Sequence, residues 1–118
     1  MKSIYNEQQP EPIEKKESVE IYPELKKDMK KLAKKIKMDN RKYEELMLFL
    51  DDRVEDGKKH YGTMLKSHNG RDARIDALQE LADFLFYIKQ LHIEGKIDLD
   101  TYAKIMRKEL YVIDMLCD

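Results

Sequence analysis

Residues 72–94 constrain the fold more than any other segment, because apolar side chains cover most of the circumference of a helix drawn through them. Leu78, Ala82 and Leu85 point in one direction, and further apolar residues extend this surface on both sides. The remaining polar side chains follow one line, at spacings of four, four, three, four and three residues: Asp72, Asp76, Glu80, Asp83, Tyr87 and Gln90. A helix that is apolar over most of its surface is buried in a core or between subunits. The segment therefore predicts a central, buried helix with a single acidic line.

Three further segments have helical character. A first helix is expected to begin near Pro23, because proline suits the first helical position, and apolar residues follow at helical spacing. A second is expected over residues 40–60, capped by Asp39 or Asn40, and a last one from near Asp98 or Asp100 to the C-terminus. Residues 1–19 are polar, contain two prolines and show no periodicity, which predicts a flexible arm. Four helices with short connections predict an all-α, four-helix-bundle-like single domain over residues 20–118.

The composition limits the cellular compartment and the classes of partner that we expect for the protein. The chain has 118 residues, enough for one domain, and a formal net charge of −1, so no overall field attracts nucleic acid or an anionic membrane. We therefore expect neither nucleic acid nor a membrane as a partner. Cys117 is the only cysteine, which excludes an internal disulfide, and the N-terminus has no apolar leader segment. These features predict a protein of the reducing cytoplasm.

The one strongly basic segment lies in the first predicted helix, where seven lysines fall between residues 26 and 37. A run of this kind is usually a solvated face. The alternative is a face that contacts phosphate groups or nucleic acid.

The acidic line needs compensation, because carboxylates one turn apart destabilise a helix by about 0.2–0.5 kcal/mol per pair, and by more when they are buried. A second acidic group on the preceding predicted helix favours a bound cation: Asp51, Asp52 and Glu55. If these two helices pack antiparallel, Asp51 and Glu55 face Glu80 and Asp83, and carboxylate oxygens are ligands that Mg²⁺ prefers. The alternatives are a salt-bridge network with the lysines of the first helix and plain exposure to solvent.

These acids carry a resemblance to a known family. The residues D-D-R-V-E at 51–55, 24 intervening residues and E-L-A-D at 80–83 resemble the E-E-x-x-E and E-x-x-D motifs of the MazG-like, all-α nucleoside triphosphate pyrophosphohydrolase superfamily. Residues 61–90 are further similar to small phage and prophage proteins with the pattern Y-G-x-x-L, N-G-R-D and E-L-x-D. Covering residues 43–94, the resemblance implies a helical homo-oligomer, a dimer or tetramer. It would use Mg²⁺, or alternatively Mn²⁺, to hydrolyse nucleoside triphosphates to monophosphate and pyrophosphate. A phage origin would place it in the cytoplasm of a bacterial host.

The resemblance also implies roles for individual residues. Glu55, Glu80 and Asp83 would bind the metal. Asp51 or Asp52 would complete the ligand set or position the attacking water.

Three cations beside or within the loop that precedes the central helix are candidate phosphate ligands: Lys58, Lys66 and Arg71. Arginine suits this role because its fork contacts phosphate oxygens bidentately. Tyr87, like Tyr61, is a candidate to stack on a nucleotide base. The alternatives are ordinary surface cations and aromatic residues of the core.

Asp51 and Asp52 stand where the family has glutamates, and each is one methylene shorter. Magnesium sites tolerate little variation in distance, so catalysis depends on these two positions. Three functions therefore remain open: a pyrophosphohydrolase, an oligomer that binds a nucleotide or nucleotide-derived signal without cleaving it, and a structural module in which acids meet the lysine-rich helix.

Overall fold

The protein is an all-α chain, as its sequence predicts. The structure is a computed structural model that describes residues 3–117. Within these residues there are four α-helices and one short 3₁₀ helix, and no strand: η1 (Ile4–Asn6), α1 (Ile21–Lys35), α2 (Asn40–Tyr61), α3 (Ala73–Ile93) and α4 (Leu99–Leu116).

Aspartate caps define the starts of three helices. The Asp39 side chain accepts a hydrogen bond from the Lys42 amide at α2, Asp72 accepts from the Arg74 amide at α3, and Asp98 accepts from the Thr101 amide at α4. Each bond satisfies one of the amide groups that a helix start leaves without a partner. The sequence left open which of two residues caps α2 and α4, and the structure assigns Asp39 and Asp98.

The chain forms two compact units. One spans residues 11–70 and contains α1 and α2; the other spans residues 1–10 together with residues 71–118 and contains η1, α3 and α4. We call them the α1–α2 unit and the α3–α4 unit, and describe each by itself. The domain range predicted from the sequence, 20–118, stays a prediction.

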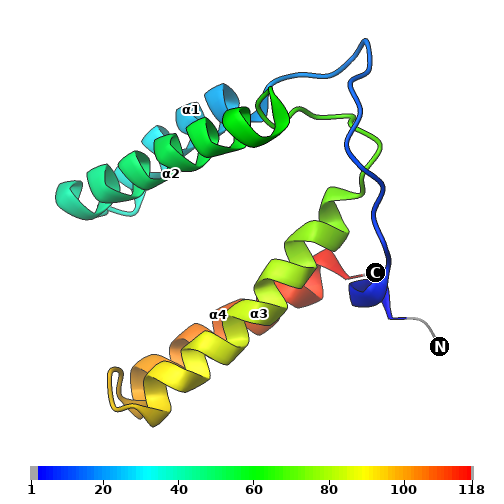
Figure 1. Ribbon diagram of the computed structural model, residues 1–118. Coiled ribbons are helices and arrows are strands. Elements are labelled where there is room, and N and C mark those ends of the chain that lie inside the picture. The colour runs from blue at the N-terminus through cyan, green and yellow to red at the C-terminus, as the bar shows by residue number, and fades with distance from the viewer. Residues whose placement is uncertain (1–2, 118) are drawn as a thin grey trace. The chain divides into compact units, whose positions relative to one another are not determined.

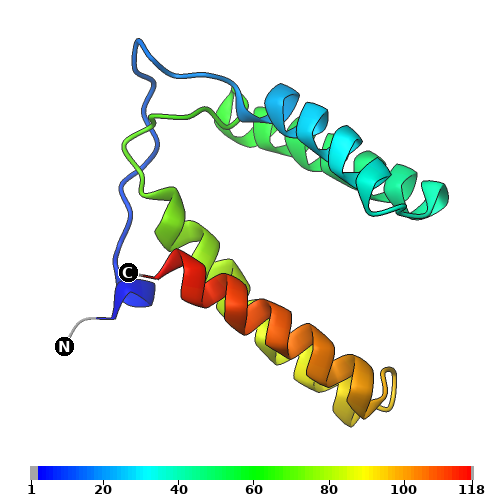
Figure 2. The ribbon, with the colours of Figure 1, turned by 180° about the vertical axis from the view of Figure 1, so that it is seen from behind.

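In the α1–α2 unit the two helices run antiparallel (Figures 1 and 2). The Tyr22 hydroxyl of α1 donates a hydrogen bond to the Asp51 carboxylate of α2, and Lys26 lies 3.6 Å from the same carboxylate. The segments that enter and leave this helix pair also run antiparallel, through backbone bonds from Ile21 to Leu65 (3.1 Å), from Ser67 to Val19 (2.8 Å) and from Ile13 to Asn69 (2.8 Å). Part of the segment predicted to be a flexible arm therefore makes backbone contacts, at Ile13 and Val19, and its mobility stays a prediction.

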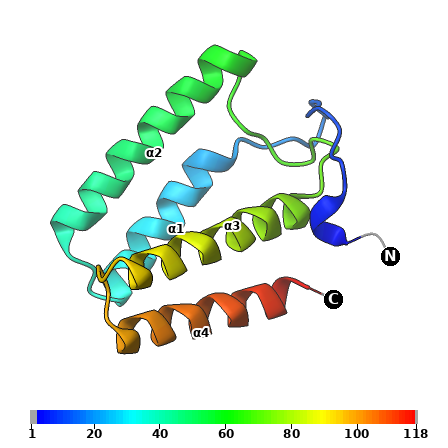
Figure 3. The ribbon, with the colours of Figure 1, turned by 60° about the horizontal axis from the view of Figure 1, so that its bottom comes forward.

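In the α3–α4 unit the two helices pack side by side and antiparallel (Figure 3). The most buried apolar side chains of the described residues all belong to α3: Ile75, Leu78 and Ile88. Burial all round α3 was expected, yet Phe86 is 77% exposed and Ile93 is 73% exposed. The physical reason is that α4 is a single helix and covers one side of α3. Burial of the remaining surface between subunits stays a prediction.

None of the helices described over residues 3–117 combines the length and the apolar character needed to cross a bilayer.

Candidate functional site

Two of the carboxylates predicted to bind the metal lie on α3. Glu80 and Asp83 are three residues apart, which places them on the same face with their Cβ atoms about 5–6 Å apart. Both side chains are exposed, and within residues 3–117 neither takes part in a hydrogen bond or an ion pair. Tyr87 follows one turn later and is 63% exposed. The α3 face therefore offers two uncompensated negative charges beside an accessible aromatic ring.

The acids of α2 have different surroundings. Asp51 accepts the Tyr22 hydroxyl bond and lies near Lys26, and these contacts hold the pKa of its carboxyl below the usual value. Desolvation, followed by the hydrogen bond to Asp51 and the charge of that carboxylate, raises the pKa of Tyr22 to about 12. Asp52 is exposed and makes no polar side-chain contact among the described residues. Of the two predicted catalytic aspartates, one is thus held by α1 and the other faces solvent.

Each of the three candidate phosphate ligands already lies beside a carboxylate. Lys58 is 3.4 Å from Glu55, which is itself a predicted metal ligand. Lys66 is 2.8 Å from Glu14, and this contact raises the pKa of the lysine.

Arg71 makes the third of these pairs, with Asp76. Its Nε and Nη2 atoms donate to the two oxygens of Asp76 at 3.2 and 2.7 Å. This bidentate arrangement satisfies the carboxylate, and it neutralises the charge that a phosphate would need.

The predicted acids fall into two groups that belong to different units. Asp51, Asp52 and Glu55 lie on α2, whereas Glu80 and Asp83 lie on α3. Within either unit taken by itself, the described residues contain no group of three or more His, Cys, Asp or Glu side chains suited to holding a metal ion. A site built from both helices therefore stays a prediction, and the structure supplies two carboxylates for it on α3.

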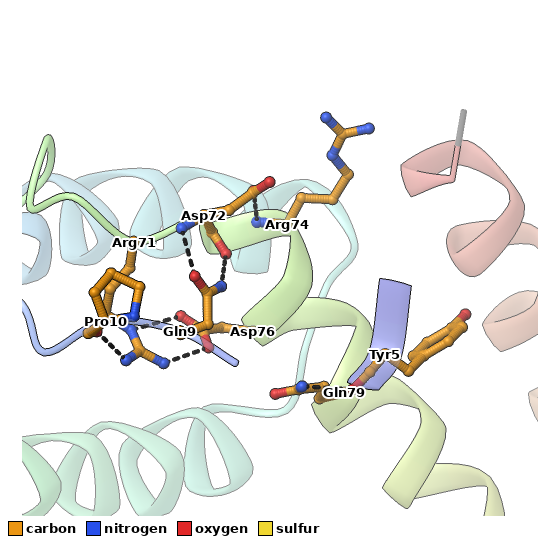
Figure 4. Close-up of polar contacts among 8 residues, drawn as sticks. All are labelled: Tyr5, Gln9, Pro10, Arg71, Asp72, Arg74, Asp76 and Gln79. Atoms are coloured by element: carbon orange, nitrogen blue, oxygen red, sulfur yellow. Dashed lines mark hydrogen bonds and ion pairs between the residues drawn. The ribbon is translucent and has the colours of Figure 1, made fainter. Parts of the chain in front are cut away.

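The structure adds polar contacts that the sequence did not indicate (Figure 4). The side-chain amide of Gln9 pairs with the backbone of Asp72, and the Pro10 carbonyl accepts a bond from Arg71. These partners are more than sixty residues apart in the chain, and no spacing rule connects them. A polar, proline-containing N-terminal segment gave no signal that it would contact the start of α3.

Comparison of the chain with protein-family models, curated proteins and solved structures gives no match. Membership of the pyrophosphohydrolase superfamily therefore stays a prediction.

Proposed function

We propose that the protein binds nucleotide phosphates through Mg²⁺, and that Glu80 and Asp83 hold this ion. The observation that carries the proposal is the placement of these two carboxylates on one exposed face of α3, with no basic partner among residues 3–117. Like charges at this spacing destabilise a helix. A cation shared between them removes that cost.

Two carboxylates are enough for this kind of site. Mg²⁺ is commonly bound through one or two carboxylates, with water and substrate phosphates completing its coordination. The exposed Tyr87 ring, one turn from Asp83, supports stacking on the base of the same nucleotide. The ligand class is therefore a nucleoside phosphate.

The first activity we propose is hydrolysis of a nucleoside triphosphate to monophosphate and pyrophosphate. When bound, Mg²⁺ polarises phosphoryl oxygens and lowers the pKa of a coordinated water. For this activity the family resemblance implies that Glu55 would add a ligand and that Asp51 or Asp52 would orient the attacking water. Mn²⁺, which also takes oxygen ligands, is the alternative ion.

A specific observation favours a second candidate, binding without cleavage. Asp51 is occupied by the Tyr22 hydroxyl and the Lys26 ammonium. A carboxylate held in this way is a poor base for a water molecule, because these contacts lower its pKa. On this reading the chain sequesters an intact nucleotide or nucleotide-derived signal.

Exposed apolar side chains support a homo-oligomer, a dimer or tetramer, in either case. Phe86, Ile93 and Leu110 of the α3–α4 unit are all more than half exposed. Where such side chains gather into one apolar patch, they mark an interaction site, and a subunit interface would bury them. The single free cysteine, Cys117, is compatible with the reducing cytoplasm, which we propose as the location.

Thermal denaturation with and without ATP and Mg²⁺ tests the binding proposal. A ligand that binds only the folded state stabilises it, by about 2.7 kcal/mol at a hundredfold excess over Kd. Glu80→Gln and Asp83→Asn should abolish the Mg²⁺-dependent part of this shift. The matched controls are Glu44→Gln and Asp114→Asn, which remove exposed carboxylates elsewhere, and they should keep the shift. An equal shift in all variants contradicts the assignment of Glu80 and Asp83.

Release of pyrophosphate separates the two candidates. A hydrolase releases pyrophosphate from at least one nucleoside triphosphate with Mg²⁺ or Mn²⁺, and loses this activity in Glu80→Gln. Calorimetric binding of an intact nucleotide with no product supports sequestration. No binding and no turnover across ribo- and deoxyribonucleotides would reject both.

A further inference from the structure

Residues 5–10 lie against α3 and the end of α4 as a strap, and we use this name for them. The strap makes polar contacts with the rest of the α3–α4 unit at four places. Three are drawn in Figure 4: the N-cap of α3, the guanidinium of Arg71 and the Gln79 side chain in the first half of α3. The fourth is Cys117, just after α4, and all four belong to one unit of the protein.

The tightest of these contacts is made by Gln9. Its Nε2 donates to the Asp72 carbonyl at 2.6 Å, and its Oε1 accepts from the Asp72 amide at 3.2 Å. One side-chain amide therefore pairs with both backbone groups of the residue that caps α3. Because Asp72 also accepts from the Arg74 amide, the strap is attached to the residue on which the first turn of α3 depends.

The next residue of the strap reaches Arg71. The Pro10 carbonyl accepts a bond from Nη1 at 2.7 Å, while Asp76 accepts from Nε and Nη2. A carbonyl and a carboxylate thus occupy all three nitrogens of the guanidinium. The Arg71 side chain is 28% exposed, so this arrangement is only partly open to solvent.

The other end of the strap is fixed at Tyr5. Its backbone carbonyl accepts a bond from Gln79 Nε2 at 2.7 Å, and its hydroxyl lies 3.9 Å from Sγ of Cys117. These contacts attach the strap to α3 two turns after the Gln9 contact and to the last residues described after α4. The strap is therefore held at both ends, with Gln9 and Pro10 at the end near Arg71.

We propose that the strap is an autoinhibitory latch that keeps Arg71 closed against Asp76, and that a phosphate ligand competes with it for the guanidinium. The competition rests on the proposed function, since it assigns Arg71 to the nucleotide phosphates. In the closed state Nη1 of Arg71 donates a hydrogen bond to the Pro10 carbonyl. In the open state a phosphate oxygen takes the place of that carbonyl, and the ligand supplies the negative charge that Asp76 otherwise provides.

A latch of this kind lowers the apparent affinity in proportion to the fraction of molecules that are open. Gln9 offers a way to shift that fraction, because its two side-chain hydrogen bonds hold the strap to the backbone of Asp72. Each of its two hydrogen bonds is worth about a factor of two to ten in the closing equilibrium. Gln9→Ala should therefore open the latch by about tenfold, and Gln8→Ala is the matched control, since Gln8 is exposed and makes no polar contact among the described residues.

Amide hydrogen exchange on the full chain, resolved by residue, tests the latch without any ligand. The Asp72 amide should exchange about tenfold faster in Gln9→Ala than in the wild-type protein, while amides in the middle of α4 keep their rates. Gln8→Ala should match the wild type. Unchanged exchange at Asp72 in Gln9→Ala would refute the latch.

Binding of inorganic triphosphate, measured by calorimetry, tests the competition. Gln9→Ala should bind it about tenfold more tightly than the wild type and Gln8→Ala, and the added change Arg71→Gln should remove this gain. Faster exchange with unchanged triphosphate affinity would refute competition at Arg71. If no variant binds triphosphate, the competition is refuted with the proposed function, and the exchange result still decides whether the strap is a latch.

Discussion

Replacing Leu78 of α3 by alanine tests how much of the protein's stability comes from apolar burial in the α3–α4 unit. Leu78 is the one apolar side chain among the described residues with no exposed surface. The change removes three carbon atoms, which at about 0.8 kcal/mol each gives about 2.4 kcal/mol for transfer from water. The cavity left behind adds to this, and buried leucines in well-packed helical proteins lose about 3–5 kcal/mol in total. Domains unfold with about 5–15 kcal/mol, so we expect the loss of a large share of the stability.

Urea unfolding followed by far-ultraviolet circular dichroism measures this loss. The matched control is Leu99→Ala, in the same unit, where the leucine is 66% exposed. That variant should lie within about 0.5 kcal/mol of the wild type. A cost below about 1 kcal/mol for Leu78→Ala would refute the argument, because such a value is ordinary for positions with little burial. Equal costs for the two variants would also refute it, because Leu78 is buried and Leu99 is exposed.

Three further predictions concern pH and the backbone. Because the folded-state pKa of Asp51 is depressed, its contribution to stability is present above its unfolded pKa and is lost as pH falls through the folded value; Asp51→Asn should therefore flatten the acid limb of a plot of unfolding free energy against pH. The pKa of Tyr22 is raised to about 12, so its contribution is present below the unfolded value and is lost as pH rises toward 12. The pKa of Tyr5 is raised as well, by its contact with Cys117, so an absorbance titration should show late tyrosine absorbance that decreases, but does not vanish, in Tyr22→Phe. Gly57 lies within α2, where an added Cβ meets no atom within 4 Å, so Gly57→Ala should stabilise the folded protein by about 0.5–1 kcal/mol. Gly95 has a φ of +73°, which L side chains rarely adopt, so Gly95→Ala should destabilise it by about 1 kcal/mol in the same urea assay.

The helix termini could be predicted from the sequence because their causes are local. Asp39, Asp72 and Asp98 each accept a bond from an amide two or three residues later, so the capping residue and the helix it begins are neighbours in the chain. Gly95 ends α3 for the same kind of reason, since it adopts a positive φ directly after the last turn. The all-α class follows from these signals together with the helical spacing of the apolar residues, which is also local.

The partners of the candidate site could not be predicted in this way. Lys66 meets Glu14 across 52 residues of chain, and Tyr22 meets Asp51 across 29. Nothing in the local sequence distinguishes these residues from other polar side chains, because their pairing depends on the tertiary fold. The same limit applies to burial: the wheel of α3 identified its apolar sides, but how many helices cover them is a tertiary property.

The antiparallel pairing of residues 13–21 with residues 65–69 has a consequence for the order in which the protein assembles. The α1–α2 unit is continuous in sequence, so it is complete before α3 is made, while Gln9 must wait for Asp72, 63 residues later. At about 5–20 residues per second, this delay lasts roughly 3–13 s on the ribosome. The contact between Ile13 and Asn69 forms within the earlier unit and leaves Pro10 and Arg71 as near neighbours. Most of the entropy cost of closing the loop between residues 10 and 71 is then met before the strap contacts α3. The last step of assembly therefore joins segments that are already close in space.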